Sequence, residues 1–220
     1  MNVNIGCGMT PTPGWNNYDN SWSVRLANWL VIVSMLERFR LLTPSQITYI
    51  NFAKQNNISW ADATKSIPLE NNSVGILYSS HMLEHLDSKR RGSFLGEARR
   101  VLKEGGVIRL VVPDLRIFVD RYNENGDADE FVHKLHMNRD MPSTLGEKLR
   151  YFLIGDRHHQ WNYDGNSLCK LMSESGFINP VVLSAGNTTL KNSGPLDLSE
   201  RAEESLYVEA RKPQFRPIDQ

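Results

Sequence analysis

Short runs of hydrophobic residues, separated by polar stretches, predict seven β-strands along the chain. The runs occupy residues 3–5, 15–18, 58–61, 74–79, 107–112, 180–183 and 205–210. Those at 74–79 and 107–112 are almost continuously apolar, which is typical of strands covered on both faces in a parallel sheet. These two strands are therefore the expected centre of the fold.

Between the strands, apolar residues recur at helical spacing and predict the connecting helices. We expect helices over about 23–42, from Thr43 to Asn56-Asn57, through Phe94 to a stop at Gly105-Gly106, over 115–124 and 128–137, near 143–154, and from Asp164 to Ser175. The start signal is clearest at Thr43-Pro44-Ser45-Gln46, which supplies an N-cap, a proline at the first position and a capping-box glutamine.

Strands that alternate with helices predict an α/β fold of the Rossmann-like type. We expect a mostly parallel seven-stranded sheet with helices on both faces, in which the last two strands can pair antiparallel. Pro11 and Pro13 forbid a helix directly after the first strand, so the first crossover is shortened. We expect a single domain over residues 1–220, in which residues 115–160 form a helical cap.

Composition narrows the class of partner. The 25 basic and 25 acidic side chains balance, which gives no long-range attraction for nucleic acid or an anionic membrane. Two cysteines give no disulfide framework. The most apolar stretch, Trp29 to Met35, is too short to span a bilayer and is expected to form a buried or interface helix. Since no secretory signal precedes the first strand, we expect a cytoplasmic protein.

The first strand ends in a glycine turn, Asn4-Ile5-Gly6-Cys7-Gly8. Glycines without a Cβ let a ligand approach the backbone closely, although any tight turn can use them. The third glycine of the dinucleotide fingerprint is missing, and the chain has no G-x-x-x-x-G-K-[ST] phosphate loop. The turn therefore favours a ligand without phosphates over NAD or ATP.

Two aspartates follow successive strands. Asp19 comes just after the second strand and Asp62 just after the third, at the sheet edge where ligands of open α/β folds lie. Asp19 can accept both hydroxyls of a ribose, and Asp62 can accept from an adenine amino group while the Ala63 amide donates to the ring. Either aspartate alone is better explained as a turn cap, but the two together favour an adenosine site.

These stretches resemble the class I S-adenosylmethionine (SAM)-dependent methyltransferases, especially the small bacterial type with N-I-G-C-G followed by G-W-N-N-Y-D. The resemblance covers most of the chain, through Ala61-Asp62-Ala63 with Ile67-Pro68-Leu69, Tyr78 to Leu86, and Glu97 to Pro113. It implies SAM as cofactor, held by Asn4, Gly6, Cys7, Gly8, Asp19, Asp62, Ala63, Ser80 and His81. The chain departs from the pattern at Asn4 and Gly75, where acids are usual, and at Thr10 and Pro11, which replace the third glycine and the first helix.

Methyl transfer from a sulfonium is an in-line displacement, for which the protein supplies mainly alignment. An acceptor hydroxyl or protonated amine also needs a general base, and His81 and His159 are the candidates. His81 directly follows the fourth strand, and His159 lies in a loop that can fold over the acceptor pocket beside the cap of 115–160. The spacing of Glu84-His85 and His158-His159 matches no established metal site, so we expect no metal.

Other residues near these motifs have simpler explanations. Trp15, Trp60 and Trp161 can stack on a ring or sugar, but core packing is the expected role of large aromatic residues. Cys7 is expected to be a small filler and not a nucleophile.

The leading hypothesis is an enzyme that transfers a methyl group from SAM to an O or N atom of a small-molecule or glycan-type acceptor. The glycan class comes from the resemblance alone. A catalytically inactive module that binds SAM or S-adenosylhomocysteine (SAH) stays open because of Asn4 and the missing third glycine. An NAD-linked oxidoreductase is disfavoured, and no nucleic-acid or membrane partner is expected.

Overall fold

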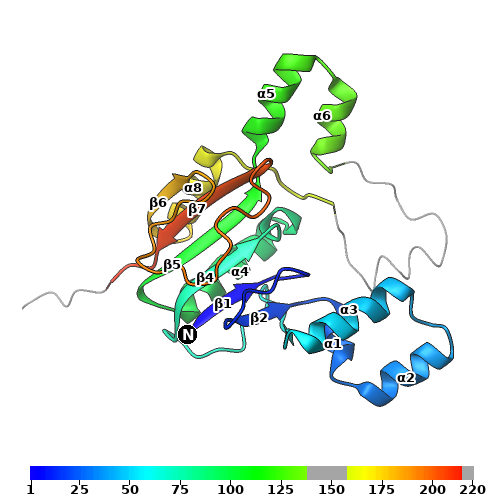
Figure 1. Ribbon diagram of the computed structural model, residues 1–220. Helices are drawn as coiled ribbons and strands as arrows, with labels where there is room; N and C mark the ends of the chain where they lie inside the picture. The colour runs from blue at the N-terminus through cyan, green and yellow to red at the C-terminus, as the bar shows by residue number, and fades with distance from the viewer. Residues whose placement is uncertain (138–157, 215–220) are drawn as a thin grey trace, which may run out of the picture.

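The computed structural model describes residues 1–137 and 158–214, apart from the side chain of Leu30. Seven strands form one sheet in the order β3-β2-β1-β4-β5-β7-β6 (Figure 1). All neighbours from β3 to β5 are parallel, whereas β7 is antiparallel to both β5 and β6. The strands are β1 Asn2–Ile5, β2 Asn16–Asp19, β3 Ser59–Trp60, β4 Val74–Ser80, β5 Leu102–Pro113, β6 Ile178–Leu183 and β7 Ser205–Arg211. The predicted mostly parallel sheet with an antiparallel final pair is confirmed.

The crossover from β1 to β2 contains no helix, as the prolines predict. Two buried asparagines supply the hydrogen bonds that hold it. The Asn4 amide donates to the Thr10 carbonyl (3.0 Å) and to Thr12 Oγ1 (3.1 Å). The Asn17 side chain accepts from the Thr12 amide (2.8 Å) and donates to the Thr12 carbonyl (3.0 Å). The loop is therefore tied down at Thr12, between the two strands that it joins.

The described helices largely follow the predicted order. They are α1 Trp22–Ala27, α2 Leu30–Arg38, α3 Pro44–Gln55, the 3-10 turn η1 Leu83–His85, α4 Ser88–Val101, α5 Leu115–Asn125, α6 Ala128–Lys134 and α8 Gly165–Glu174. The Thr43–Gln46 capping box and the Asp164 N-cap are both present. The helix expected near 143–154 lies outside the described residues.

Two helix predictions are wrong in their bounds. The segment 23–42 contains two helices, because the chain leaves helical conformation at Asn28-Trp29. The helix predicted to reach Gly105-Gly106 ends at Val101, and β5 runs through both glycines. A Cβ at Gly106 would lie 2.8 Å from the Lys103 carbonyl oxygen, so this glycine permits a close backbone approach in the strand instead of ending a helix.

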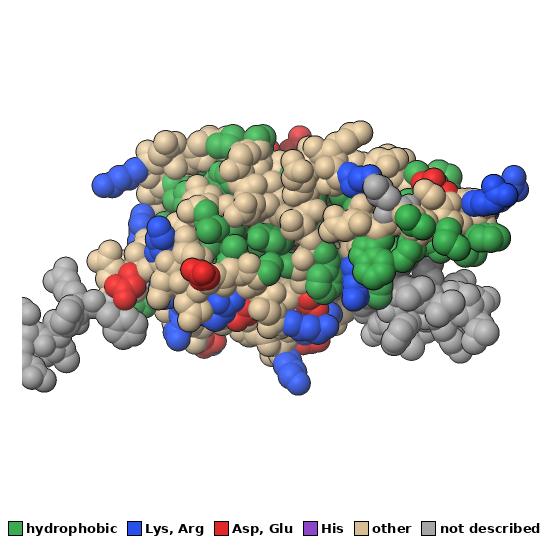
Figure 2. Space-filling view, turned by 90° about the horizontal axis from the view of Figure 1, so that it is seen from below, with side chains coloured by type: hydrophobic (Ala, Val, Ile, Leu, Met, Phe, Trp, Pro, Cys, Tyr) green, Lys and Arg blue, Asp and Glu red, His purple; other side chains and the backbone are tan. Residues whose placement is uncertain are grey.

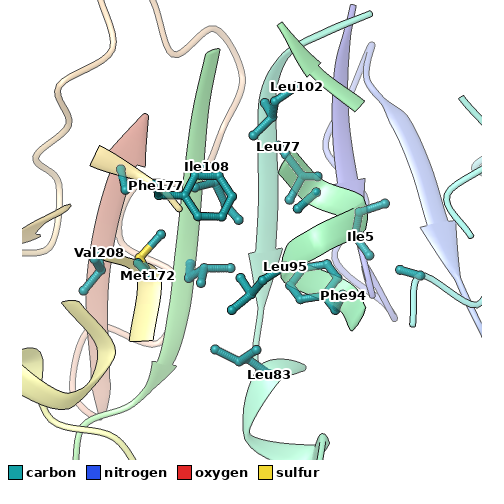
Figure 3. Packing of buried hydrophobic residues seen from close by; sticks show 14 of the residues in the cluster. Ile5, Leu77, Leu83, Phe94, Leu95, Leu102, Ile108, Met172, Phe177 and Val208 are labelled. Atoms are coloured by element: carbon teal, nitrogen blue, oxygen red, sulfur yellow. The ribbon is translucent and has the colours of Figure 1, made fainter. Parts of the chain in front are cut away.

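The main hydrophobic core lies between the sheet and the helices α4 and α8. In Figure 3, Leu77 of β4 and Ile108 of β5 lie in the same layer as Phe94 and Leu95 of α4 and Met172 of α8, and all are at most 1% exposed. The opposite face of these strands packs under the loop between β6 and β7 in a second cluster of buried residues: Tyr78, Val111, Leu196 and Tyr207. The central strands are therefore covered on both faces, as their apolar runs predict.

Helices α1, α2 and α3 form a separate group beyond the β2–β3 end of the sheet (Figure 1). Trp29, Val31 and Met35 are 60%, 75% and 55% exposed, so the prediction of a buried helix is wrong, and an interface helix stays a prediction. Figure 2 shows hydrophobic side chains gathered on the surface at this end of the molecule. No helix among the described residues has the length and apolarity that a membrane crossing requires.

Candidate active site

The glycine turn lies at the carboxyl end of β1 and is held against β2. The amides of Gly6 and Cys7 both donate to the Tyr18 carbonyl (2.8 and 3.1 Å). Gly6 has φ +70°, and a Cβ there would lie 2.9 Å from Cγ of Met82. A Cβ at Gly8 would meet no heavy atom of the described residues within 4 Å. Gly6 thus permits contact with the segment after β4, and Gly8 borders open space that a ligand can enter.

Asp19, the last residue of β2, stabilises this turn through hydrogen bonds to its carboxylate. Its Oδ2 accepts from the Gly8 amide (3.2 Å) and its Oδ1 from the Ser21 amide (2.8 Å). The hydroxyl of Tyr49 donates to the Gly8 carbonyl from the side of α3 (3.2 Å). Each carboxylate oxygen keeps a second lone pair, so Asp19 can still accept from the hydroxyls of a ribose.

Asn4 and Ser80 lie near the carboxyl ends of the neighbouring parallel strands β1 and β4. Both carry buried polar atoms that the described residues leave without a hydrogen bond. The Asn4 side chain is 1% exposed, and its Oδ1 has no partner although its nitrogen has two. Ser80 Oγ is also buried and without a partner. Buried orphan groups are rare in native proteins and favour an unseen ligand. They fit a cofactor held across β1 and β4.

Asp62 lies just beyond β3 and caps its own turn. Its Oδ1 accepts from the amide (3.2 Å) and hydroxyl (2.6 Å) of Thr64, and its Oδ2 lies 3.1 Å from Lys65 Nζ. Burial alone would raise the pKa of this carboxyl, but the bonds from Thr64 and Lys65 outweigh it and lower the pKa. Ala63 is buried in the main core. The turn-capping role is present in the structure, and the adenine contact stays a prediction.

Cys7 is buried, and burial together with the nearby charge of Asp19 raises the pKa of its thiol to about 12. A thiol that stays protonated is a poor nucleophile, which supports the filler role.

The core role predicted for two tryptophans is wrong: Trp60 is 38% and Trp161 50% exposed. Their rings stack instead with guanidinium groups, of Arg25 at 5.1 Å and of Arg91 at 4.8 Å.

His81, which follows β4, has an unusual backbone and a held ring. Its φ is +48°, a left-handed conformation that costs a non-glycine residue roughly 1–2 kcal/mol. Its amide donates to the Val111 carbonyl (2.9 Å). Its Nε2 lies 3.0 Å from Ser205 Oγ and its Nδ1 3.4 Å from Glu84 Oε1. Strained residues held by their surroundings cluster at functional sites.

A cavity of about 300 Å³ opens at the carboxyl ends of β4 and β5. Its lining comes from distant parts of the chain: His81, Glu84, His85, Pro113, Phe118, Lys134, His136, His159, Arg201 and Glu204. The two histidines predicted as bases are therefore brought to one cavity. Because Gly6 lies against Met82, the glycine turn adjoins the segment that carries His81.

Backbone hydrogen bonds place His159 in this cavity. The amides of Gln160 and Trp161 donate to the Glu84 carbonyl (2.7 and 3.2 Å), which fixes their segment against η1. The His159 ring lies edge-on to that of His85, with centroids 5.1 Å apart. Burial lowers the pKa of His159 against the opposing effect of the Glu84 charge, which favours the neutral ring at pH 7.

No motif in the sequence marks Glu84 as a functional residue. Its side chain is 1% exposed, yet neither carboxylate oxygen has a hydrogen bond from the described residues. The only local signal is a charged residue between Leu83 and Leu86, two positions that are buried in the core. Its partner His159 comes from far along the chain, which no local spacing reveals.

A mostly parallel sheet with a glycine turn after β1 and an acid at the end of β2 is the arrangement of a Rossmann-like α/β fold, in which ligands lie beyond the carboxyl ends of the strands. A family model described as a methyltransferase domain matches residues 33–110. The match extends from α2 into β5 and includes His81 and Glu84, while the glycine turn and Asp19 precede it. No curated protein matches the sequence.

Solved structures of SAM-dependent methyltransferases share this fold. One from Thermotoga maritima, described as a possible histamine N-methyltransferase, has a TM-score of 0.52 at 16% identity, covering 96% of this chain and 81% of its own. Another from Methanosarcina mazei has a TM-score of 0.50 at 14% identity, covering 97% and 92%. The matched domain over residues 33–110 and the shared fold make this chain similar to SAM-dependent methyltransferases.

Proposed function

We propose that the chain transfers a methyl group from SAM to an O or N atom of a small-molecule or glycan-type acceptor bound in the cavity beside His81. The observation that carries this proposal is the position of the cavity. It opens at the carboxyl end of β4, and the segment after β4 contacts the glycine turn at Gly6 and Met82. An acceptor in the cavity would therefore lie next to the cofactor.

We assign the cofactor-binding residues from their positions at the carboxyl ends of the strands. In this proposal Asp19 accepts from the ribose, Asp62 and Ala63 face the adenine, and the remaining contacts come from Asn4, Gly6, Cys7, Gly8, Ser80 and His81. The orphaned oxygens of Asn4 and Ser80 support it. SAM, when bound, supplies the methyl group, and the chain's own residues orient the acceptor and hold its proton.

His81 and His159 are the proposed bases. Glu84 beside Nδ1 of His81 favours the tautomer with hydrogen on Nδ1, which leaves the lone pair on Nε2. His159 is held in the cavity wall by its own amide, which donates to the His136 carbonyl, and by the neighbouring amides of Gln160 and Trp161, which donate to Glu84 of η1. Both rings line the space that the acceptor would occupy.

The cavity wall supports the proposal of a polar acceptor of modest size. About 300 Å³ is at the small end of small-molecule sites. Its lining combines the cations Lys134 and Arg201 with the anions Glu84 and Glu204. Phe118 of α5 and Lys134 of α6 also line it, which supports the proposal that residues 115–160 cap the acceptor site.

The test combines binding and turnover. Calorimetry with SAM, SAH and NAD should show binding of the first two alone, and SAH release should appear with one of a set of amine, phenol and sugar acceptors. His81→Gln should lower turnover more than SAM affinity, while His133→Gln, an exposed change outside the cavity lining, should alter neither. Failure to bind both SAM and SAH would overturn the proposal. SAM binding without turnover on any acceptor would favour the inactive binding module.

The cytoplasmic location is part of this proposal, and cell fractionation tests it.

A further inference from the structure

Three side chains in the cavity wall converge in a way that methyl transfer alone does not require. Glu84 and His85 come from η1, and His159 comes from the segment before α8. One potential ligand atom from each lies within 4.8 Å of the other two. The linear spacing of these residues predicts no metal site, and only the fold brings them together.

The Glu84 carboxylate lacks the hydrogen bonds that a buried anion needs. It is 1% exposed, and its closest recorded basic neighbours are His81 Nδ1 at 3.4 Å and His85 Nε2 at 3.8 Å. Neither oxygen accepts a hydrogen bond from the part of the chain that is described. Burying an ionised carboxylate in this state is costly, so the site favours a positive charge close to Glu84.

The tautomers of the two histidines also favour a positive charge close to Glu84. Nδ1 of His85 lies 3.3 Å from the His158 carbonyl oxygen. A carbonyl only accepts, so this Nδ1 carries the hydrogen, and in the neutral ring the lone pair is on Nε2, which faces Glu84 Oε1. When both groups are deprotonated, these two acceptors, 3.8 Å apart, repel each other, and a bound cation or a proton between them removes the repulsion.

His159 repeats this arrangement. Its Nδ1 lies 3.4 Å from Asn162 Oδ1. The orientation of that amide is set by its nitrogen, which donates to the Leu135 carbonyl (3.4 Å). Asn162 therefore accepts from Nδ1–H of His159, and the lone pair of the neutral ring is again on Nε2.

We propose that Glu84, His85 and His159 form a binding site for a divalent transition-metal ion of the zinc type. Two imidazole nitrogens and one carboxylate are a ligand set that zinc accepts, with a fourth position left for water or a substrate oxygen. The carbonyl partners of the two Nδ1 atoms would orient the rings, as outer-shell groups do in known sites. The fourth position would face the cavity.

Binding requires a small contraction of the site. Ligand atoms around a tetrahedral zinc ion lie roughly 3.3 Å apart, whereas those of Glu84 and His85 are 3.8 Å apart. Rotation of the side chains closes this gap, since His85 is partly exposed and its ring has room to move. The ion supplies the positive charge that Glu84 lacks.

This inference goes beyond the proposed function, because a metal can be measured without any acceptor. The full chain is treated with a chelator, freed of it, and titrated with zinc by calorimetry, with metal content determined by elemental mass spectrometry. We expect one zinc per chain. Glu84→Gln, His85→Gln and His159→Gln should each weaken binding by more than about 100-fold, and Asn162→Ala by roughly 10–100-fold as an outer-shell change.

His133→Gln is the matched control: an exposed histidine of α6 outside the ligand set, whose replacement should leave zinc affinity unchanged. SAM affinity is measured in every variant to show that the cofactor site is intact. Zinc binding that survives in the double variant His85→Gln/His159→Gln, or no binding at micromolar zinc, would overturn the metal site. SAH release by the chelated protein at an undiminished rate would leave methyl transfer standing without the metal, so the two proposals fail separately.

Discussion

Two buried glutamates, both 1% exposed, have opposite surroundings. Glu209 of β7 accepts from Arg109 Nη1 (2.7 Å) and the Thr188 hydroxyl (2.6 Å) on one oxygen, and from the amide (2.7 Å) and hydroxyl (2.5 Å) of Thr189 on the other. Glu84 of η1 accepts no hydrogen bond from the described residues. One carboxylate is satisfied within the protein, and the other has no hydrogen bond from the described residues, as our proposed metal site requires.

We infer from this difference that the charge of Glu209 stabilises the fold, whereas the charge of Glu84 serves the site. A buried charge with a full set of partners holds elements together, here β5, β7 and the loop between β6 and β7. A buried charge without partners raises the free energy of the unliganded protein and is tolerated where a ligand completes the site.

Glu209→Ala should destabilise the protein by about 3–5 kcal/mol, the cost of breaking a buried ion pair by removing one partner. Arg109 is 0% exposed and would be left as an uncompensated charge. Urea unfolding followed by circular dichroism measures the change. Glu203→Ala, on the exposed surface just before β7, should stay within about 0.5 kcal/mol. A loss below about 1 kcal/mol for Glu209→Ala would contradict the structural role.

The same carboxylate predicts a loss of stability in acid. Burial alone would raise the pKa of Glu209, but the bonds from Thr188, Thr189 and Arg109 outweigh burial and lower the pKa. A lowered pKa stabilises the fold above the pKa of the unfolded chain, about 4.3, and this contribution disappears as pH falls through the folded value. Unfolding free energies between pH 7 and pH 3 should therefore fall, and Glu209→Gln should flatten the slope. An unchanged slope in that variant would assign the acid sensitivity to other groups.

Asp19→Ala should weaken SAM binding by about 1–3 kcal/mol, through loss of charge-assisted hydrogen bonds to the ribose and of the brace on Gly8. Calorimetry measures the affinity, and circular dichroism shows whether the variant is folded. Asp129→Ala, on the exposed side of α6, should bind SAM as the unchanged protein does. Equal affinity in a folded Asp19→Ala protein would show that the ribose lies elsewhere.

The parts that could be predicted from the sequence are those with local causes. Apolar runs indicate the strands, Thr43 and Asp164 indicate helix starts, and the prolines indicate the missing first helix, because each effect acts within a few residues. The helix end predicted at Gly105-Gly106 is wrong for the same reason. The local sequence does not distinguish a glycine that ends a helix from a glycine that permits a neighbouring strand to approach closely. Only the position of Gly106 against Lys103 and β4 distinguishes them.

The parts that could not be predicted depend on contacts between distant residues. Arg109 and Glu209 are 100 positions apart, and a charge within an apolar strand does not name its partner. Glu84 and His159 meet only because backbone bonds hold the segment before α8 against η1. The proposed cofactor side of the site rests on local features, since Gly6, Gly8 and Asp19 lie within one short loop and its flanking strands, and its role in binding stays a prediction.

Gly6→Ala should destabilise the protein by about 1–2 kcal/mol, because φ +70° is unfavourable for a residue with a Cβ. The added methyl would also lie 2.9 Å from Met82 Cγ, where the cofactor side meets the segment after β4. Gly96→Ala is the matched control on α4, where a Cβ meets nothing within 4 Å. It should stabilise the helix by roughly 0.5–1 kcal/mol. Shifts of the same sign in both variants would contradict the requirement for glycine at position 6.

Glu84→Gln should cause the smallest change in the free energy of unfolding, and that change tests whether Glu84 and Glu209 have different roles. In metal-free protein, Glu84→Gln should change the free energy of unfolding by less than about 1 kcal/mol or increase it, because the variant removes a buried charge that lacks hydrogen bonds. Turnover should nevertheless fall, since the carboxylate no longer orients His81. Urea unfolding and SAH release are measured on the same preparation. A loss of 3 kcal/mol or more, equal to that of Glu209→Ala, would mean that Glu84 is a second structural charge and that the cavity is organised by other groups.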